Sequence, residues 1–147
     1  MDVVYLDYNC YKRSFDDHRQ IKIQMEALAC QAIFDKAEKQ ELQLVWSFMH
    51  EDETILCPFS ERKIEVFRLS NLCTIEVEPI GEVYNNAKLF HSSIGFSAKD
   101  SIHVASALYA KAQFFLTCDD DILRRAKRLS LEITFMNPVD YIRKEIH

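Results

Sequence analysis

Short apolar runs alternate with stretches of helical periodicity along the whole chain. The runs are rich in β-branched and aromatic residues, and they cover residues 3–6, 42–46, 73–77, 114–117 and 131–135. Their length and composition predict buried strands. Between them, apolar side chains return every three or four positions, which places them on one face of a helix.

Helices are therefore predicted between the strands. A first helix follows Asp16 and Asp17, which offer an N-cap, and its apolar positions are Ile21, Met25, Leu28, Ala29, Ala32 and Ile33. A helix over residues 58–69 is expected to direct Ile64 and Phe67 inward. The remaining helices are predicted around residues 83–90, over 97–112 and 120–129, and in the tail.

This alternation predicts an α/β fold with a mostly parallel five-stranded sheet and helices on both faces. The chain has only two glycines and three prolines and no Gly/Ser/Pro-rich linker. A single domain over residues 1–147 is therefore expected. No Gly-rich phosphate loop is present, which argues against P-loop NTPases and dinucleotide-binding folds. In parallel sheets, ligands bind beyond the carboxyl ends of the strands.

Composition narrows the function classes. The formal net charge is −5, whereas a protein that binds nucleic acid by bulk electrostatics is normally basic. A nucleic-acid role must then rest on a local patch or on bound cations. No apolar run is long enough to cross a membrane and no signal peptide is visible, so a cytoplasmic protein is predicted. The five cysteines form no C-x-x-C pair, which favours free thiols over a zinc ribbon.

Acidic residues follow the predicted strands at the edge where ligands bind. Asp7 follows the first strand, and an acidic cluster over residues 51–53 follows the second. Asp100 opens the helix before the fourth strand, and Asp119 and Asp121 come directly after that strand. Several carboxylates at one edge cannot all be ionised unless a cation joins them. Oxygen ligands suit Mg²⁺ or Mn²⁺, and two such ions can activate water for phosphodiester hydrolysis.

Each aspartate also has a purely structural interpretation. Asp100 stands three residues after Ser97, which is a capping-box-like start to a helix. Asp119 could cap the helix that follows it, and Asp7 could accept hydrogen bonds from backbone amides of the next turn. Four caps on one edge of a sheet are less expected than one shared site, provided that the α/β prediction holds.

Four segments of the chain resemble those of PIN domains. The first is VVYLDYNCYKRSFDD, and the second is LQLVWSFMHEDETILCPFSERK. The third and most specific is SAKDSIHVASALYAKAQFFLTCDDDILRRAKRL, with an aspartate at a helix start and a Thr-x-Asp ending of a strand. The last is MNPVDYI. Together these segments extend over nearly the whole chain.

The resemblance implies a metal-dependent endoribonuclease. Many PIN relatives are toxins of the VapC type that an antitoxin protein holds, so an RNA substrate, an antitoxin partner and a homodimer are expected. The catalytic residues and metal ligands it implies are Asp7, Glu53, Asp100 and Asp119, with Asp121 as a further metal ligand. Glu51 or Asp52 could take the place of Glu53 if the helix winds differently. The expected cofactor is Mg²⁺ or Mn²⁺.

The resemblance also implies that Asn9 orders the site and that Ser47 hydrogen-bonds a metal ligand. Basic residues beside the acidic edge are candidates for RNA binding, although charged residues on a helix are more often a solvated face; they are Lys12, Arg13, Arg124 and Arg125. His103 could shuttle protons, but a packing role is more common for such a histidine.

Two other function classes fit part of the pattern. A degenerate PIN-like domain would bind RNA or a protein without cutting, and Mg²⁺-dependent cleavage that EDTA abolishes would exclude it. A receiver-like signalling domain also collects acids at strand ends. That class needs an aspartate after its third strand and a lysine after its fifth, where this chain has Pro79 and Asn137.

Overall fold

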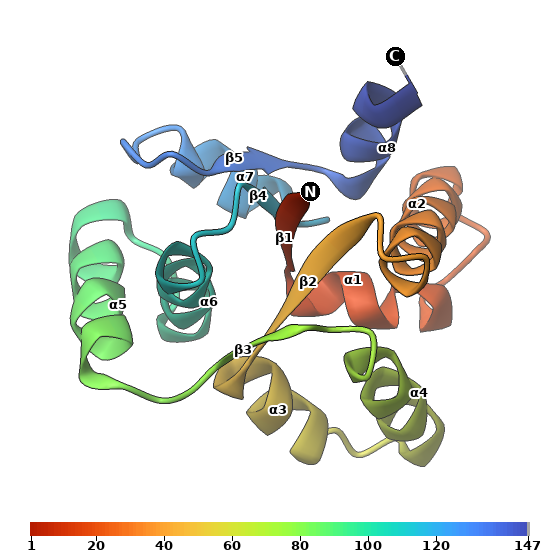
Figure 1. Ribbon diagram of the computed structural model, residues 1–147, viewed down its shortest axis with the longest axis horizontal. Coiled ribbons are helices and arrows are strands. Elements are labelled where there is room, and N and C mark those ends of the chain that lie inside the picture. Colours follow the sequence, from red (N-terminus) through yellow and green to blue (C-terminus); the bar gives the residue numbers. More distant parts are fainter. Residues whose placement is uncertain (147) are drawn as a thin grey trace.

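The computed structural model describes residues 1–146, with side chains described to residue 144. Its five strands form one parallel sheet in the order β3-β2-β1-β4-β5 (Figure 1). The strands are β1 Asp2–Leu6, β2 Leu42–Ser47, β3 Ile75–Val77, β4 Phe114–Leu116 and β5 Thr134–Met136. The predicted α/β fold with a five-stranded sheet is confirmed, and the sheet is parallel throughout the described residues.

Eight α-helices and one 3₁₀ turn connect and flank the strands within residues 1–146. They are α1 Tyr8–Lys12, the 3₁₀ turn Arg13–Phe15, α2 Ile21–Glu38, α3 Phe48–Ile55, α4 Ser60–Ser70, α5 Gly81–Ile94, α6 Ala98–Tyr109, α7 Asp120–Ala126 and α8 Pro138–Ile146. None of the helices in this range is both long and apolar enough to span a membrane.

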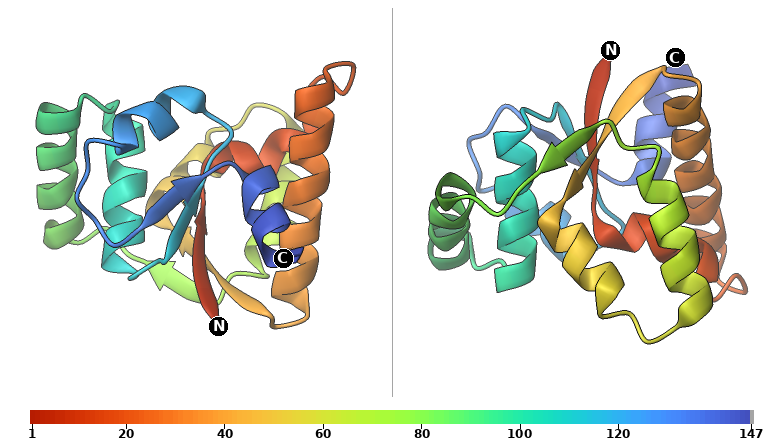
Figure 2. Two further views of the ribbon diagram at one scale, coloured as in Figure 1. Left: turned by 90° about the horizontal axis from the view of Figure 1, so that it is seen from above. Right: turned by 60° about the horizontal axis from the view of Figure 1, so that its bottom comes forward.

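The strands contribute side chains to two separate hydrophobic cores, because successive side chains point to opposite faces of a sheet. Val4 and Leu6 pack against α1, α2, α4 and α8, whereas Tyr5 packs against α5, α6 and α7. Leu44 and Val45 of β2 divide between the two cores in the same way. Figure 2 shows the result, with α5 and α6 on one side of the sheet and α2 and α8 on the other.

The strand order creates a crevice at the carboxyl edge. From β1 the chain moves outward through β2 and β3, then crosses back to place β4 and β5 on the other side of β1. The connections after β1 and β4 therefore leave in opposite directions, and ligands of open α/β sheets bind at such a switch point. The order also differs from the 2-1-3-4-5 order of the receiver-type sheet. Asp7 and Thr117 directly follow the two strands that border the crevice.

Two local predictions are wrong. Gln20, not Asp16 or Asp17, is the N-cap of α2 and it makes no side-chain capping bond. The two aspartates instead pair with arginines of their own loop. Ile64 is 70% exposed, because α4 turns Val66 and Leu69 toward the sheet. Helical spacing alone does not say which of two apolar stripes faces the core.

Candidate active site

Four carboxylates line one cleft at the carboxyl edge. The cleft has a volume of about 140 Å³ and lies at the ends of β1 and β4. Its acidic lining is Asp7, Glu53, Asp100 and Asp119, and its other lining residues are Tyr8, Asn9, Lys12, Lys99 and His103. The four residues that sequence and resemblance singled out as catalytic are thus brought together.

Asp7 is held in one orientation by the backbone and by two polar neighbours. It follows β1, its amide donates to the Leu116 carbonyl (2.8 Å), and its side chain is buried. The Oδ1 atom caps α1 by accepting from the Tyr8 amide (2.8 Å). The Oδ2 atom accepts from the Thr117 hydroxyl (2.6 Å) and the Asn9 amide (3.2 Å).

Asn9 bridges the ends of β1 and β4. Its Nδ2 donates to Asp7, and its Oδ1 accepts from the backbone amide of Cys118 (3.2 Å). The same Nδ2 lies 3.3 Å from the Thr117 hydroxyl, which in turn accepts from the Asp119 amide (3.0 Å). These bonds join the two aspartates on neighbouring strands, which is the ordering role expected of Asn9.

Capping and cleft lining coexist at the two helix starts. Asp119 caps α7 by accepting from the Asp121 amide (2.9 Å), so its structural interpretation holds while it lines the cleft. In α6 the capping bond belongs to Ser97, whose hydroxyl accepts from the Asp100 amide (3.0 Å). The carboxylate of Asp100 is not needed for that bond and faces the cleft.

The structure distinguishes between the three acids after β2. Because α3 begins directly at Phe48, Glu53 lines the carboxylate cleft, whereas Glu51 accepts from the indole of Trp46 (2.7 Å) and faces another side. Asp52 is exposed and lies outside the cleft. Glu53 is therefore the residue of the 51–53 cluster that the fold supplies to the site.

A buried chain of polar side chains fixes Glu53. The Nε2 of His103 donates to the Glu53 carboxylate (2.5 Å), so the Nδ1 is free to accept from the Tyr5 hydroxyl (2.6 Å). Tyr5 in turn bonds the hydroxyl of Ser47 (2.8 Å). All members except Glu53 are fully buried, and such chains are rigid when every member has a partner.

His50 closes this chain at its inner end. Its Nε2 donates to the Leu6 carbonyl (2.7 Å), and its Nδ1 accepts from the Ser47 amide (2.9 Å). Both nitrogens are thus used by the neutral ring, and burial holds the pKa of His50 well below its usual range.

Ser47 does not bond a candidate ligand directly, so that prediction is wrong. Its hydroxyl contacts Tyr5 and His50, and the carboxylate of Glu53 lies beyond Tyr5 and His103 in the chain. Ser47 is the last residue of β2 and lies on the face of the sheet that packs against α6.

Asp121 is not part of the cleft, contrary to the predicted ligand set. Its carboxylate pairs with Arg124 and with Arg125 Nε (2.8 Å) on the next turn of α7. Residues three and four positions apart share one helix face, and opposite charges there pair readily. The two arginines are consequently engaged, and Arg125 also lies against the end of α5 through the Ile94 carbonyl (3.5 Å). Neither arginine lines the cleft, and their role in RNA binding stays a prediction.

The two basic residues after β1, Lys12 and Arg13, have different surroundings. Arg13 turns inward and makes two hydrogen bonds to the buried carboxylate of Glu26 (3.0 and 2.8 Å), so it is not available to RNA. Lys12 lines the cleft and lies over the ring of Tyr8, 5.5 Å from its centroid. Lys99 is a further cation at the cleft, 3.9 Å from Glu53, and sequence reasoning missed it.

The electrostatics of the cleft suit a cation. Burial raises the pKa of Asp7 above its usual range, and the charge of Asp100 adds to the effect. Burial likewise raises the pKa of Asp100, with contributions from Asp119 and Glu53. A bound divalent ion would relieve this repulsion. The four carboxylates offer oxygen ligands, which are the ligands that Mg²⁺ and Mn²⁺ prefer.

Two members of the site carried little sequence signal. Tyr5 lies inside an apolar strand run, and its hydroxyl could have been noticed only as a polar group on the buried face of β1. His103 stands one helical turn after Asp100, which is why both reach the same cleft. It touches Glu53 and is buried, so packing and site roles coincide.

Two solved structures share this fold over nearly the whole chain. One is the crystal structure of VapBC2 from Rickettsia felis bound to a DNA fragment from their promoter, with a TM-score of 0.60 and 10% identity, covering 92% of this chain and 98% of that one. Another is the crystal structure of FitAcB from Neisseria gonorrhoeae, with a TM-score of 0.55 and 16% identity. The match covers 92% of this chain and 97% of that one. No protein-family model and no curated protein matches the sequence. The likeness establishes a PIN-like fold.

Proposed function

We propose that this chain is an endoribonuclease that hydrolyses RNA with Mg²⁺ or Mn²⁺, and that it acts as the toxin of a toxin–antitoxin pair. The observation that carries the proposal is the convergence of Asp7, Glu53, Asp100 and Asp119 on one cleft at the switch point of the sheet. The toxin role rests on the resemblance and the shared fold, and it is an argument by analogy.

The residues of the cleft divide the chemical work. Divalent ions bound by the carboxylates would supply an activated water and offset the charge of the phosphodiester. Thr117 and Asn9 orient Asp7, and His103 orients Glu53. Ligands fixed in this way hold an ion in one geometry, which contributes to rate because the site needs little reorganisation during the reaction.

A groove beside the cleft fits a single strand of RNA. It has a volume of about 330 Å³ and shares Tyr8, Lys12, Glu53 and Lys99 with the cleft. Its lining also includes Phe59, whose ring centroid lies 4.5 Å from the Arg62 guanidinium carbon. Exposed aromatic rings stack on unpaired bases and nearby cations neutralise phosphates. The groove is lined by Lys12, Arg62 and Lys99 beside Asp52 and Glu53, so its local charge is more positive than the net charge of −5.

The surface also leaves room for a protein partner. Ile21, Met25 and Leu28 form an exposed apolar stripe on α2, with exposed fractions of 78%, 44% and 63%. Exposed apolar patches of this kind mark protein interaction sites. An antitoxin or a second copy of the chain would cover this stripe, and substitution of Met25 by glutamate is expected to weaken that association without affecting cleavage.

The test is cleavage of a fluorescent single-stranded RNA with Mg²⁺ or Mn²⁺, followed by EDTA. Asp119→Asn should abolish cleavage. Asp120→Asn is the matched control, because Asp120 is the next residue, is exposed and pairs with Lys22 outside the cleft. Equal activity in the two variants, or cleavage that resists EDTA, would contradict the proposal. Metal-dependent RNA binding with no cutting would favour the degenerate, binding-only alternative.

A further inference from the structure

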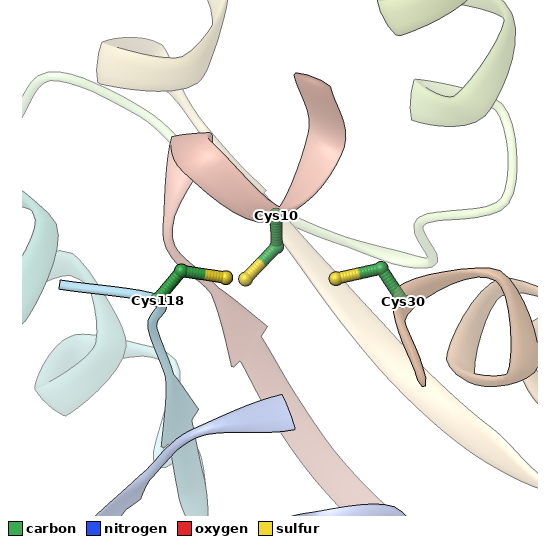
Figure 3. Close-up of side chains that lie close together, drawn as sticks. All are labelled: Cys10, Cys30 and Cys118. Atoms are coloured by element: carbon green, nitrogen blue, oxygen red, sulfur yellow. The ribbon is translucent and has the colours of Figure 1, made fainter. Parts of the chain in front are cut away.

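Three cysteines from distant parts of the sequence meet behind the cleft. Cys10 lies on α1, Cys30 on α2, and Cys118 follows β4. All three are buried, and their sulfur atoms lie within 4.8 Å of one another. Figure 3 shows the three side chains pointing toward one another from separate elements. All five cysteines are free, as the sequence predicted, but the convergence of these three was not expected.

The spacing of the sulfurs is close to that of a metal-thiolate site. Zinc–sulfur bonds of about 2.3 Å in tetrahedral geometry set ligand sulfurs roughly 3.8 Å apart. The observed upper limit of 4.8 Å therefore requires each pair to approach by at most about 1 Å. A disulfide would use only two of the three sulfurs, whereas a metal ion engages all of them.

The surroundings of the cluster are not those of a purely apolar core. The Sγ of Cys10 lies 3.5 Å from the Leu116 carbonyl oxygen and 3.5 Å from the side-chain oxygen of Asn9. Three thiolates around a divalent ion would leave one negative charge, and Arg13 adds its electrostatic effect at Cys118 while its guanidinium stays paired with Glu26 and Asp16.

We propose that Cys10, Cys30 and Cys118 form a binding site for one thiophilic metal ion of the Zn²⁺ type. Thiolates select such ions over Mg²⁺ and Mn²⁺, so this site and the carboxylate cleft take different metals. The ion would tie α1 and α2 to the end of β4. This proposal does not depend on the chain being a nuclease.

The site lies directly behind the cleft. Cys10 follows Asn9 in the chain, and the amide of Cys118 donates to the Asn9 side chain (3.2 Å). Drawing the sulfurs together would fix the two backbone segments that carry Asp7 and Asp119. Metal loading is thus expected to stiffen the carboxylate cleft from its buried side.

The first test needs no substitution. The reduced chain is refolded with one equivalent of Zn²⁺ and an excess of Mg²⁺, which occupies the carboxylates, and zinc X-ray absorption is measured. Three sulfur neighbours at about 2.3 Å are expected, with a rise in Tm of about 5–10 °C when Zn²⁺ exceeds its Kd about 100-fold. A first shell of oxygen and nitrogen alone, or no retained zinc, would overturn the proposal.

The second test uses the other two cysteines as matched controls. Cys30→Ala and Cys118→Ala should lose stoichiometric Zn²⁺ and the rise in Tm, whereas Cys57→Ala and Cys73→Ala should keep both. Circular dichroism of each metal-free variant establishes that it is folded, and if a cluster variant does not fold, the absorption measurement on the unaltered chain decides. Equal retention of zinc by all folded variants would overturn the proposal.

Discussion

Replacing Asp100 by asparagine separates the catalytic from the structural interpretation of the cleft. Asp100 is the third residue of α6, and the capping bond to Ser97 comes from its backbone, so the variant keeps that bond. The substitution removes one of four converging carboxylates at almost constant volume. We expect at least a 100-fold loss of RNA cleavage, since even residues that only support a metal ligand cost about 10–100-fold.

Stability should change little, and in the opposite direction to activity. Loss of a carboxylate near a helix start costs about 0.3–1 kcal/mol. Relief of the desolvation of the charge and of repulsion from Asp119 and Glu53, less the lost attraction to Ser97 and His103, returns about 1 kcal/mol in total at water-like screening, which is appropriate because Asp100 is only partly buried. The metal-free variant should therefore be as stable as the wild type or up to about 1 kcal/mol more stable.

The pH dependence supplies a second readout. Burial raises the pKa of Asp100 above its ordinary value of 3.8, with further contributions from Asp119 and Glu53. The folded chain then holds this proton more tightly than the unfolded chain. Its free energy of unfolding falls as the pH rises from 3.8 through the folded pKa. Without metal, the wild type should lose more stability than Asp100→Asn across this window, and Mn²⁺ should restore it only in the wild type.

Thermal melts and cleavage rates measured on the same preparations decide the matter. A variant that cuts RNA at full rate but melts earlier would show that Asp100 serves the helix start and not the chemistry. In that case Asp100 would be removed from the proposed set of metal ligands.

Three further results are expected. Glu53→Gln should reduce metal-dependent cleavage at least tenfold while Glu51→Gln leaves it unchanged, and the reverse order would mean that Glu51 supplies the ligand. Asp121→Asn should leave cleavage unchanged, since its carboxylate pairs with arginines outside the cleft; a loss as large as that of a cleft residue would restore it to the ligand set. Tyr5→Phe should lower the free energy of unfolding by about 1–3 kcal/mol, because it leaves buried polar partners unsatisfied, and urea denaturation with an unchanged midpoint would contradict this.

The sequence was sufficient to predict the parallel sheet and the carboxylates at its edge. Asp7 and Asp119 could be found because strand ends are visible as breaks in apolar runs, and parallel strands end on one side. Glu53 could not be chosen over its neighbours from the sequence. The choice depends on where α3 begins, which is at Phe48, directly after the last residue of β2.

Ion pairing was the main source of error. Arg13 and Asp121 looked like site residues, but Arg13 has a partner on another helix that the sequence does not reveal, and Asp121 pairs with arginines on the next turn of its own helix. The partner of Arg13 is Glu26, a buried acid in the second turn of α2. The cysteine cluster was missed for a related reason, because its members come from helices and a strand end that only the tertiary fold brings together.

The most direct test of the account is the location of Mn²⁺ by anomalous diffraction from crystals of the chain grown with that ion. The account predicts a peak in the cleft, bound by carboxylate oxygens from Asp7, Asp100 and Asp119, with Glu53 at the same ion or at a second one. A chain that cuts RNA in the same Mn²⁺ buffer yet binds the ion elsewhere, or not at all, would contradict it.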